Sequence, residues 1–92
     1  MKTGAELITE ERQRQIEVEG YDANHDAGEF INALVDSAIS YSLYDTNSSM
    51  SESFWPWDMK YFKPKDRQRN LVRAGALIAA AIDRLQNENN MS

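Results

Sequence analysis

The chain has 92 residues, of which 41% are hydrophobic, and this suffices for one folded domain and no more. Fifteen acidic side chains outnumber ten basic ones, for a net charge of −5. This excludes nonspecific binding to nucleic acid as the main function, because a phosphate backbone needs a net basic surface. The absence of cysteine excludes disulfides, thiolate metal sites and a cysteine nucleophile. With no signal-peptide hydrophobic region and no long apolar run, we expect a cytoplasmic protein that has no membrane partner.

The first predicted helix spans residues 4–19. Thr3 and Glu6 have the spacing of a capping box, and polar helix formers dominate the segment. Its apolar stripe is thin, so we expect this helix to pack on one side only, with Arg and Gln side chains free for other contacts. Gly20 is the natural stop.

The second predicted helix spans residues 26–43, after a connector rich in turn residues. Asp26 and Glu29 form a second capping box. Apolar side chains then follow the pattern of a buried helical stripe: Phe30, Ile31, Leu34, Val35, Ala38 and Ile39. We therefore expect this helix to supply the core. Residues 45–53, which are small and polar, are expected to form a surface loop.

Residues 53–65 hold five of the nine aromatic residues, both tryptophans and both prolines. Two prolines this close exclude a regular helix or a central strand, so we expect an ordered crossover between the second and third helices. Rings of this size would form a sticky patch in water, so the segment either covers a core or lines a pocket or interface. Trp55 and Trp57 flank Pro56 and should point in different directions, and we expect Trp57 in the core and Trp55 accessible.

The third predicted helix spans residues 66–86, with Asp66 as its N-cap. Its broad apolar face includes Gly75 and several alanines, which allow another helix to approach closely. A three-helix domain this short has too little core to cover that face, so we expect a homodimer or larger ring built on it. No period-two strand pattern occurs, so the predicted fold is an all-α, three-helix bundle-like domain that spans residues 1–92.

Several blocks of sequence in a fixed order carry a resemblance. They are Glu11-Arg12-Gln13-Arg14-Gln15, Glu19-Gly20-Tyr21, His25-Asp26, Trp55-Pro56-Trp57-Asp58 and Leu71-Val72-Arg73-Ala74-Gly75-Ala76-Leu77-Ile78. Over residues 8–86 the chain resembles a family of small helical proteins of bacteriophages and prophages that has no assigned activity. It departs from that pattern at Ala27 and Ala81, where relatives usually carry acids. The resemblance implies a phage accessory protein that acts in the host-cell cytoplasm, on host defence or nucleotide metabolism.

Basic side chains cluster beside the aromatic segment of this otherwise acidic chain. Bases stack on aromatic rings, and phosphates pair with guanidinium groups. A pocket here, closed by Arg12 or Gln15 of the first helix, would hold a nucleotide. The candidate ligand-binding residues are Trp55, Lys60, Lys63, Arg67, Arg73 and Arg12. The alternative is that the rings cap the core while the basic groups stay in solvent.

The leading functional hypothesis is a non-enzymatic antagonist of host defence that sequesters a nucleotide-derived signal, with no catalytic residue and no cofactor. Two alternatives stay open. One is a metal-dependent, MazG-like nucleotide pyrophosphatase that would hold Mg²⁺ on Glu29, Asp36 and Asp83, although its dense acidic signature is missing. The other is an inhibitor that binds a host defence protein through its acidic surface. His25 and Asp26 are interpreted as part of a helix cap rather than as a metal site.

Overall fold

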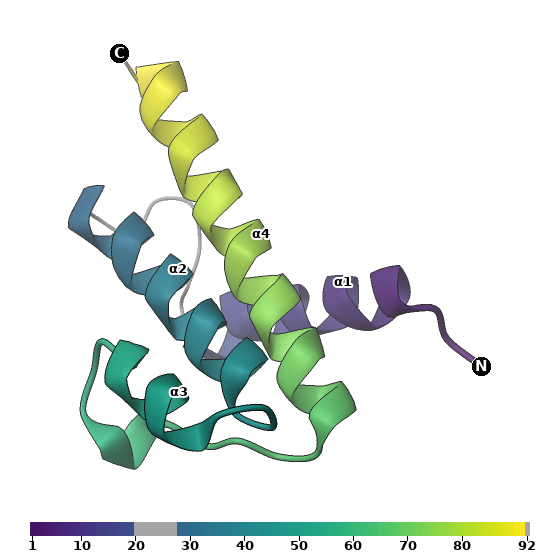
Figure 1. Ribbon diagram of the computed structural model, residues 1–92. Helices are drawn as coiled ribbons and strands as arrows, with labels where there is room; N and C mark the ends of the chain where they lie inside the picture. The colour runs from purple at the N-terminus through teal and green to yellow at the C-terminus, as the bar shows by residue number, and fades with distance from the viewer. Residues whose placement is uncertain (20–27, 92) are drawn as a thin grey trace.

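The computed structural model describes residues 1–19 and 28–91, with side chains for residues 1–19 and 30–88 (Figure 1). The described residues contain no strand and form α1 (Gly4–Arg14), a π-helix (Gln15–Glu19), α2 (Gly28–Leu43), α3 (Ser48–Phe54), a 3₁₀ turn (Met59–Tyr61) and α4 (Arg67–Met91). The all-α class is confirmed, but these described residues form four α-helices rather than the three predicted. The expected stop at Gly20, the connector after it and the cap formed by Asp26 and Glu29 lie outside the described residues.

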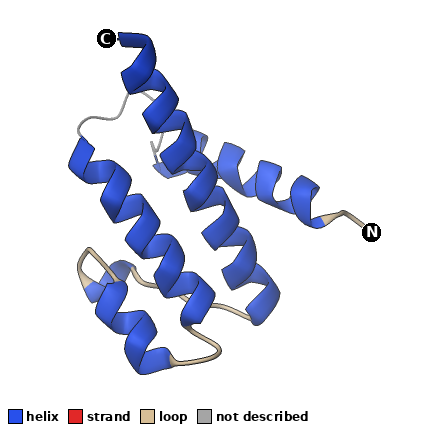
Figure 2. Cartoon of the chain, turned by 45° about the horizontal axis from the view of Figure 1, so that its top comes forward, coloured by secondary structure: helices blue, strands red, loops and turns tan. Residues whose placement is uncertain are grey.

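The long helix α4 is the centre of the fold. α2 packs along α4, α1 crosses it, and α3 packs against α2 (Figures 1 and 2). Both views show the C-terminal end of α4 projecting past α2. None of the described helices combines the length and the apolar character that crossing a membrane would require.

The predicted helix starts that fall within the described residues are confirmed by their caps. The Glu6 amide donates to Thr3 Oγ1 at 3.2 Å, and the Thr3 amide donates to Glu6 Oε1 at 2.9 Å. The Arg69 amide donates to Asp66 Oδ1 at 2.8 Å, so Asp66 caps α4. α4 continues to Met91, past the predicted end at residue 86.

The segment predicted as a loop contains α3, which is a correction. The Asn47 side chain accepts a hydrogen bond from the Met50 amide at 3.0 Å and starts the helix. Ser51 is buried, and its hydroxyl donates to the Ser40 carbonyl of α2 at 2.5 Å. Tertiary contact on this serine therefore stabilises a helix that composition alone would not predict.

The Ala/Gly-rich face of α4 is covered within the same chain. Leu34 and Ala38 of α2 pack with the buried small residues of α4, among them Ala74 and Ala80. On another side of α4, a Cβ placed at Gly75 would lie 2.5 Å from Ile8 Cδ1 of α1. This face was expected to bind a second copy, but it is used to bring α1 and α2 close to α4.

Gly75→Val should destabilise the protein by about 1–3 kcal/mol, because the added side chain would overlap Ile8. Chemical denaturation monitored by circular dichroism measures this loss. Combining Gly75→Val with Ile8→Ala makes room for the valine, so the double variant should lose less than the sum of the two single losses. Additive losses would show that Ile8 and Gly75 do not make the close contact described above.

The aromatic crossover is ordered by hydrogen bonds to buried polar side chains. Asn70 of α4 is buried, and its side-chain oxygen accepts a hydrogen bond from the Lys65 backbone amide at 2.7 Å. Its side-chain nitrogen donates to the Lys65 carbonyl and to Asp45, both at 3.0 Å. The Tyr41 hydroxyl accepts from the Lys63 amide at 3.3 Å. These contacts fix the entry of α4 and hold the aromatic segment against α2.

Candidate functional site

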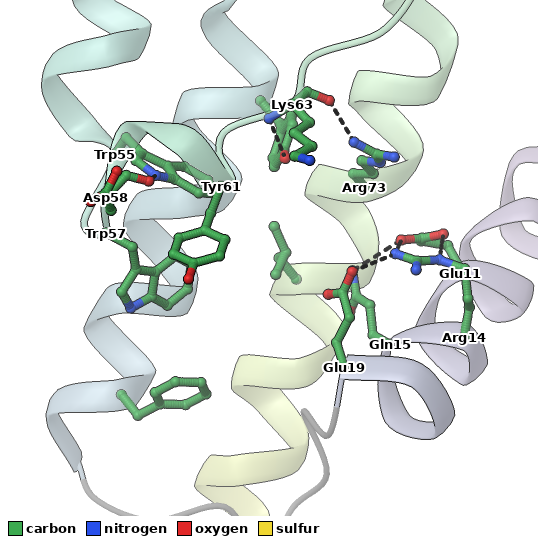
Figure 3. A pocket seen from close by; sticks show the side chains of 13 residues that line it. Glu11, Arg14, Gln15, Glu19, Trp55, Trp57, Asp58, Tyr61, Lys63 and Arg73 are labelled. Carbon is green, nitrogen blue, oxygen red and sulfur yellow. Dashed lines mark hydrogen bonds and ion pairs between the residues drawn. The ribbon is translucent and has the colours of Figure 1, made fainter.

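A cavity of about 730 Å³ lies between the aromatic crossover and the end of α1. This volume falls in the range of small-molecule sites. Figure 3 shows Trp55, Trp57 and Tyr61 on one side of the cavity, with Glu11, Arg14, Gln15 and Glu19 on the opposite side. Its other lining residues come from α2, the crossover and α4: Phe30, Tyr41, Asp58, Lys63, Arg73 and Leu77.

The aromatic wall is built by rings that contact one another. Trp55 and Trp57 meet edge to face with centroids 5.3 Å apart, Trp57 lies 6.0 Å from Phe30, and Trp55 lies 5.6 Å from Tyr41. Trp55 Nε1 also donates to the Asp58 carbonyl at 3.0 Å. Both tryptophans are half-buried, both pack against the core and both line the cavity. The expected division into a core ring and an accessible ring is therefore not what the structure shows.

The polar wall depends on a change of helical pitch at the end of α1. Arg14 is the last residue of α1, and Gln15–Glu19 form a π-helix, in which side chains five positions apart lie on one face. Arg14 Nη2 accordingly reaches both Glu11 Oε2 at 2.7 Å and Glu19 Oε1 at 2.9 Å. The π-helix thus places an alternating charge network along the cavity.

Glu11 is the centre of this network. Its buried carboxylate accepts from Arg14, from Arg69 and, at 3.4 Å, from Gln15. Burial acts to raise the pKa of Glu11, but the Arg14 hydrogen bonds and the charges of Arg14, Arg69 and Arg73 outweigh it, and the net effect is a lowered pKa. Glu11 is therefore a fully charged structural anion at neutral pH.

The charges of the cavity are unequally compensated. Glu11 and Glu19 are paired with Arg14, and Asp58 accepts from the Lys60 amide at 3.0 Å. Lys63 and Arg73, in contrast, form no ion pair with any described residue. The cations left available at the cavity can thus receive an anionic ligand.

Two buried polar atoms at the cavity lack a hydrogen-bond partner among the described residues. Gln15 is only 2% exposed, and because its amide nitrogen faces Glu11, its Oε1 is left as an unused acceptor. Arg73 donates from Nη1 to the Lys63 carbonyl at 2.6 Å and lies over the Tyr41 ring, but its Nε–H is unused. Buried atoms of this kind are normally satisfied, so a ligand or water that bonds them is expected.

The structure places three of the six predicted site residues at the cavity: Trp55, Lys63 and Arg73. Lys60 is exposed outside it, with its ammonium 5.1 Å from the centroid of the Tyr61 ring. Arg67 lies at a separate groove between α1 and α4. Arg12 is buried and pairs with Asp83 at 3.0 Å, so it fastens α1 to α4 instead of closing the cavity.

Of the polar wall, sequence reasoning named Gln15 as a residue that would close the pocket, and Gln15 does line the cavity. It overlooked Glu11, Arg14 and Glu19. Glu11 and Gln15 are four residues apart and share one face of a helix, but nothing in the sequence shows that the crossover packs opposite that face. Tyr61 belongs to the aromatic segment 53–65, but its place in the wall depends on the 3₁₀ turn.

The described residues include no group of three His, Cys, Asp or Glu side chains that could hold a metal ion. Of the acids considered for Mg²⁺, Asp83 is bonded to Arg12, and the Glu29 side chain lies outside the described residues. The described part of the structure therefore offers no support for the pyrophosphatase hypothesis.

Comparison with models of protein families, with curated proteins and with solved structures finds no match to this chain. The resemblance to phage proteins thus stays a prediction from the sequence. The function of the cavity has to be inferred from its own side chains.

Proposed function

We propose that the protein binds a nucleotide-derived small molecule in this cavity and holds it without converting it. The observation that carries the proposal is the pairing of an aromatic wall with two cations, Lys63 and Arg73, that form no ion pair with a described residue. In the setting that the phage resemblance implies, such binding would sequester a nucleotide signal of host defence.

The aromatic wall supports a ligand with a planar ring. A base inserted beside Trp57 and Tyr61 would stack on their rings, and stacking of this kind contributes about 1–3 kcal/mol per base. Across the cavity, Gln15 Oε1 would accept a hydrogen bond from a ring or exocyclic N–H of the base. A nucleobase has both the flat face and the donor that these groups require.

The unpaired cations support a phosphate on the same ligand. Lys63 offers an ammonium and Arg73 an unused Nε–H beside the rings. Charge-assisted hydrogen bonds to phosphate are the strong ones among protein hydrogen bonds. Holding the phosphate needs no net basic chain, because only these two local charges are involved.

Lys63→Ala should weaken nucleotide binding about tenfold, and the loss should shrink as salt is raised, as expected for a phosphate contact. Lys60→Ala is the matched control, because it removes the same charge three residues away and outside the cavity. Tyr61→Ala should also weaken binding about tenfold while the fold is kept, since Tyr61 is 60% exposed. Isothermal titration against mononucleotides and cyclic dinucleotides, with circular dichroism for the fold, measures both effects.

The same nucleotides are incubated with the protein and Mg²⁺ and then analysed by chromatography. Intact nucleotides recovered after binding support sequestration, whereas turnover would establish the pyrophosphatase instead. If no nucleotide shifts the melting temperature or gives a titration signal, the proposal is wrong and a host protein becomes the leading partner.

A further inference from the structure

The outward side of α4 carries a row of large apolar side chains that the described chain leaves uncovered. Leu71, Ile78, Ile82 and Leu85 are 45%, 41%, 52% and 50% exposed. Leu71, Ile78 and Leu85 are seven residues apart, and Ile82 falls between the last two, which is the seam spacing of two paired helices. Single exposed leucines are ordinary, but a heptad row along one helix is the pattern of an interface.

The apolar row on α4 continues across Gly75, although glycine has no side chain. Gly75 occupies the seam position between Leu71 and Ile78, and Ile8 of α1 lies so close that a Cβ at Gly75 would be 2.5 Å from Ile8 Cδ1. Ile8 therefore supplies an apolar group where α4 has none. Near Leu71 a groove of about 590 Å³ opens between α1 and α4, and its lining includes Lys2, Ile8 and Arg67.

We propose that this row is the interface of a homodimer in which two α4 helices pack antiparallel about a two-fold axis at Ile78. Leu71 precedes Ile78 by seven residues and Leu85 follows it by seven. Antiparallel pairing therefore sets Leu71 of one copy against Leu85 of the other, with Ile78 opposite its own counterpart. A surface that matches itself in this way is what a two-fold interface requires.

The charges at the two ends of the row favour this orientation. Arg67 lies one turn before Leu71 and shares the groove with Lys2, whereas the exposed Glu88 lies one turn after Leu85. Antiparallel helices bring Glu88 of one copy to Arg67 of the other, at both ends of the dimer. Parallel helices would set like charges against each other, which disfavours that arrangement.

The interface is distinct from the alanines of α4 that pack with α2, and it borders α1 at Gly75, where Ile8 lies. From Leu71 to Leu85 the row spans about 21 Å of helix, enough for four turns of contact. The aromatic cavity plays no part in this interface, so the dimer does not depend on the proposed nucleotide binding.

Light scattering coupled to size-exclusion chromatography, at about 100 µM, should give twice the chain mass of 10.5 kDa. Ile78→Glu should reduce the mass to that of one chain, because two carboxylates would meet at the axis. Val18→Glu, at an exposed apolar position outside the row, should leave the mass doubled. A single-chain mass for the unaltered protein, or a doubled mass for folded Ile78→Glu, would overturn the proposal.

Engineered cysteines test the orientation, because the chain has none of its own. When Leu71→Cys and Leu85→Cys proteins are mixed and oxidised, disulfides should join the two variants to each other. Leu71→Cys alone should stay uncrosslinked, and disulfide formation by that variant alone would mean parallel helices and overturn the antiparallel arrangement. Arg67→Glu should weaken association, and Glu88→Arg added to it should restore association. Failure of that rescue would contradict the pairing of Arg67 with Glu88.

Discussion

Leu34→Ala should destabilise the protein by about 2–5 kcal/mol, which is enough to unfold most of a marginal domain of this size. Leu34 is 1% exposed and lies in the core between α2 and α4. Truncation removes its buried surface and leaves a cavity that the small neighbours on α4 cannot fill, because an alanine has no side-chain rotamers with which to move into the space. Thermal and urea unfolding monitored by circular dichroism measure the loss.

Val18→Ala is the control for this variant, because Val18 is an exposed apolar residue and its truncation should change stability by less than about 0.5 kcal/mol. If the two variants melted within a degree or two of each other, the packing of α2 on α4 would not be the main source of stability.

Glu11→Gln should cost about 3 kcal/mol of stability. The carboxylate is buried, and its replacement by a neutral amide removes the negative charge and one of the two acceptor oxygens that join Arg14, Arg69 and Gln15. This cost lies at the low end of the range for breaking a buried ion pair, because Arg14 and Arg69 both keep part of their surface in water. Glu10→Gln is the matched control, since the neighbouring Glu10 pairs with Lys2 at the exposed surface and should contribute under 1 kcal/mol.

The dependence of this difference on pH follows from the lowered pKa of Glu11. A carboxyl group whose pKa is lower in the folded than in the unfolded protein binds its proton more readily when unfolded. Its stabilisation is complete above its ordinary value of 4.5 and is lost as the pH falls through the folded-state value. The gap in unfolding free energy between the unaltered protein and Glu11→Gln should therefore be widest near pH 7 and narrow below about pH 4.5. A gap that stays constant down to pH 3 would show that the Glu11 charge is not what matters.

Much of the helical architecture can be predicted because caps and apolar spacing are local signals. Thr3 with Glu6, Asp66 and the stripe around Leu34 are each visible within a few residues. α3 could not be predicted in this way, because the buried Ser51 gains its partner, the Ser40 carbonyl, only when the chain folds back on α2. The sequence around Ser51 is polar and does not indicate that this serine will be buried against α2.

The aromatic half of the cavity could be predicted, but the polar half only in part, for a similar reason. A cluster of rings around two prolines indicates an ordered segment that covers a core or lines a pocket. The roles of basic residues depend instead on which acids the fold brings near them: Arg12 meets Asp83, and Arg14 meets Glu11 and Glu19. Arg73 lies near enough to Glu11 to influence its charge but forms no ion pair with a described residue. The number and order of charged residues in the sequence do not show which arginines will form ion pairs and which will not.

The edge-to-face contact of Trp55 with Trp57 gives the protein an optical reporter. These two are the only indoles in the chain, and both lie in the wall of the cavity. All tryptophan fluorescence therefore originates at the site, and a stacked nucleobase would quench it directly. Two indoles with centroids 5.3 Å apart also couple their electronic transitions, so the near-ultraviolet circular dichroism depends on the angle between them. Occupancy of the cavity can thus be followed without a label, by tryptophan emission, which comes only from these two side chains.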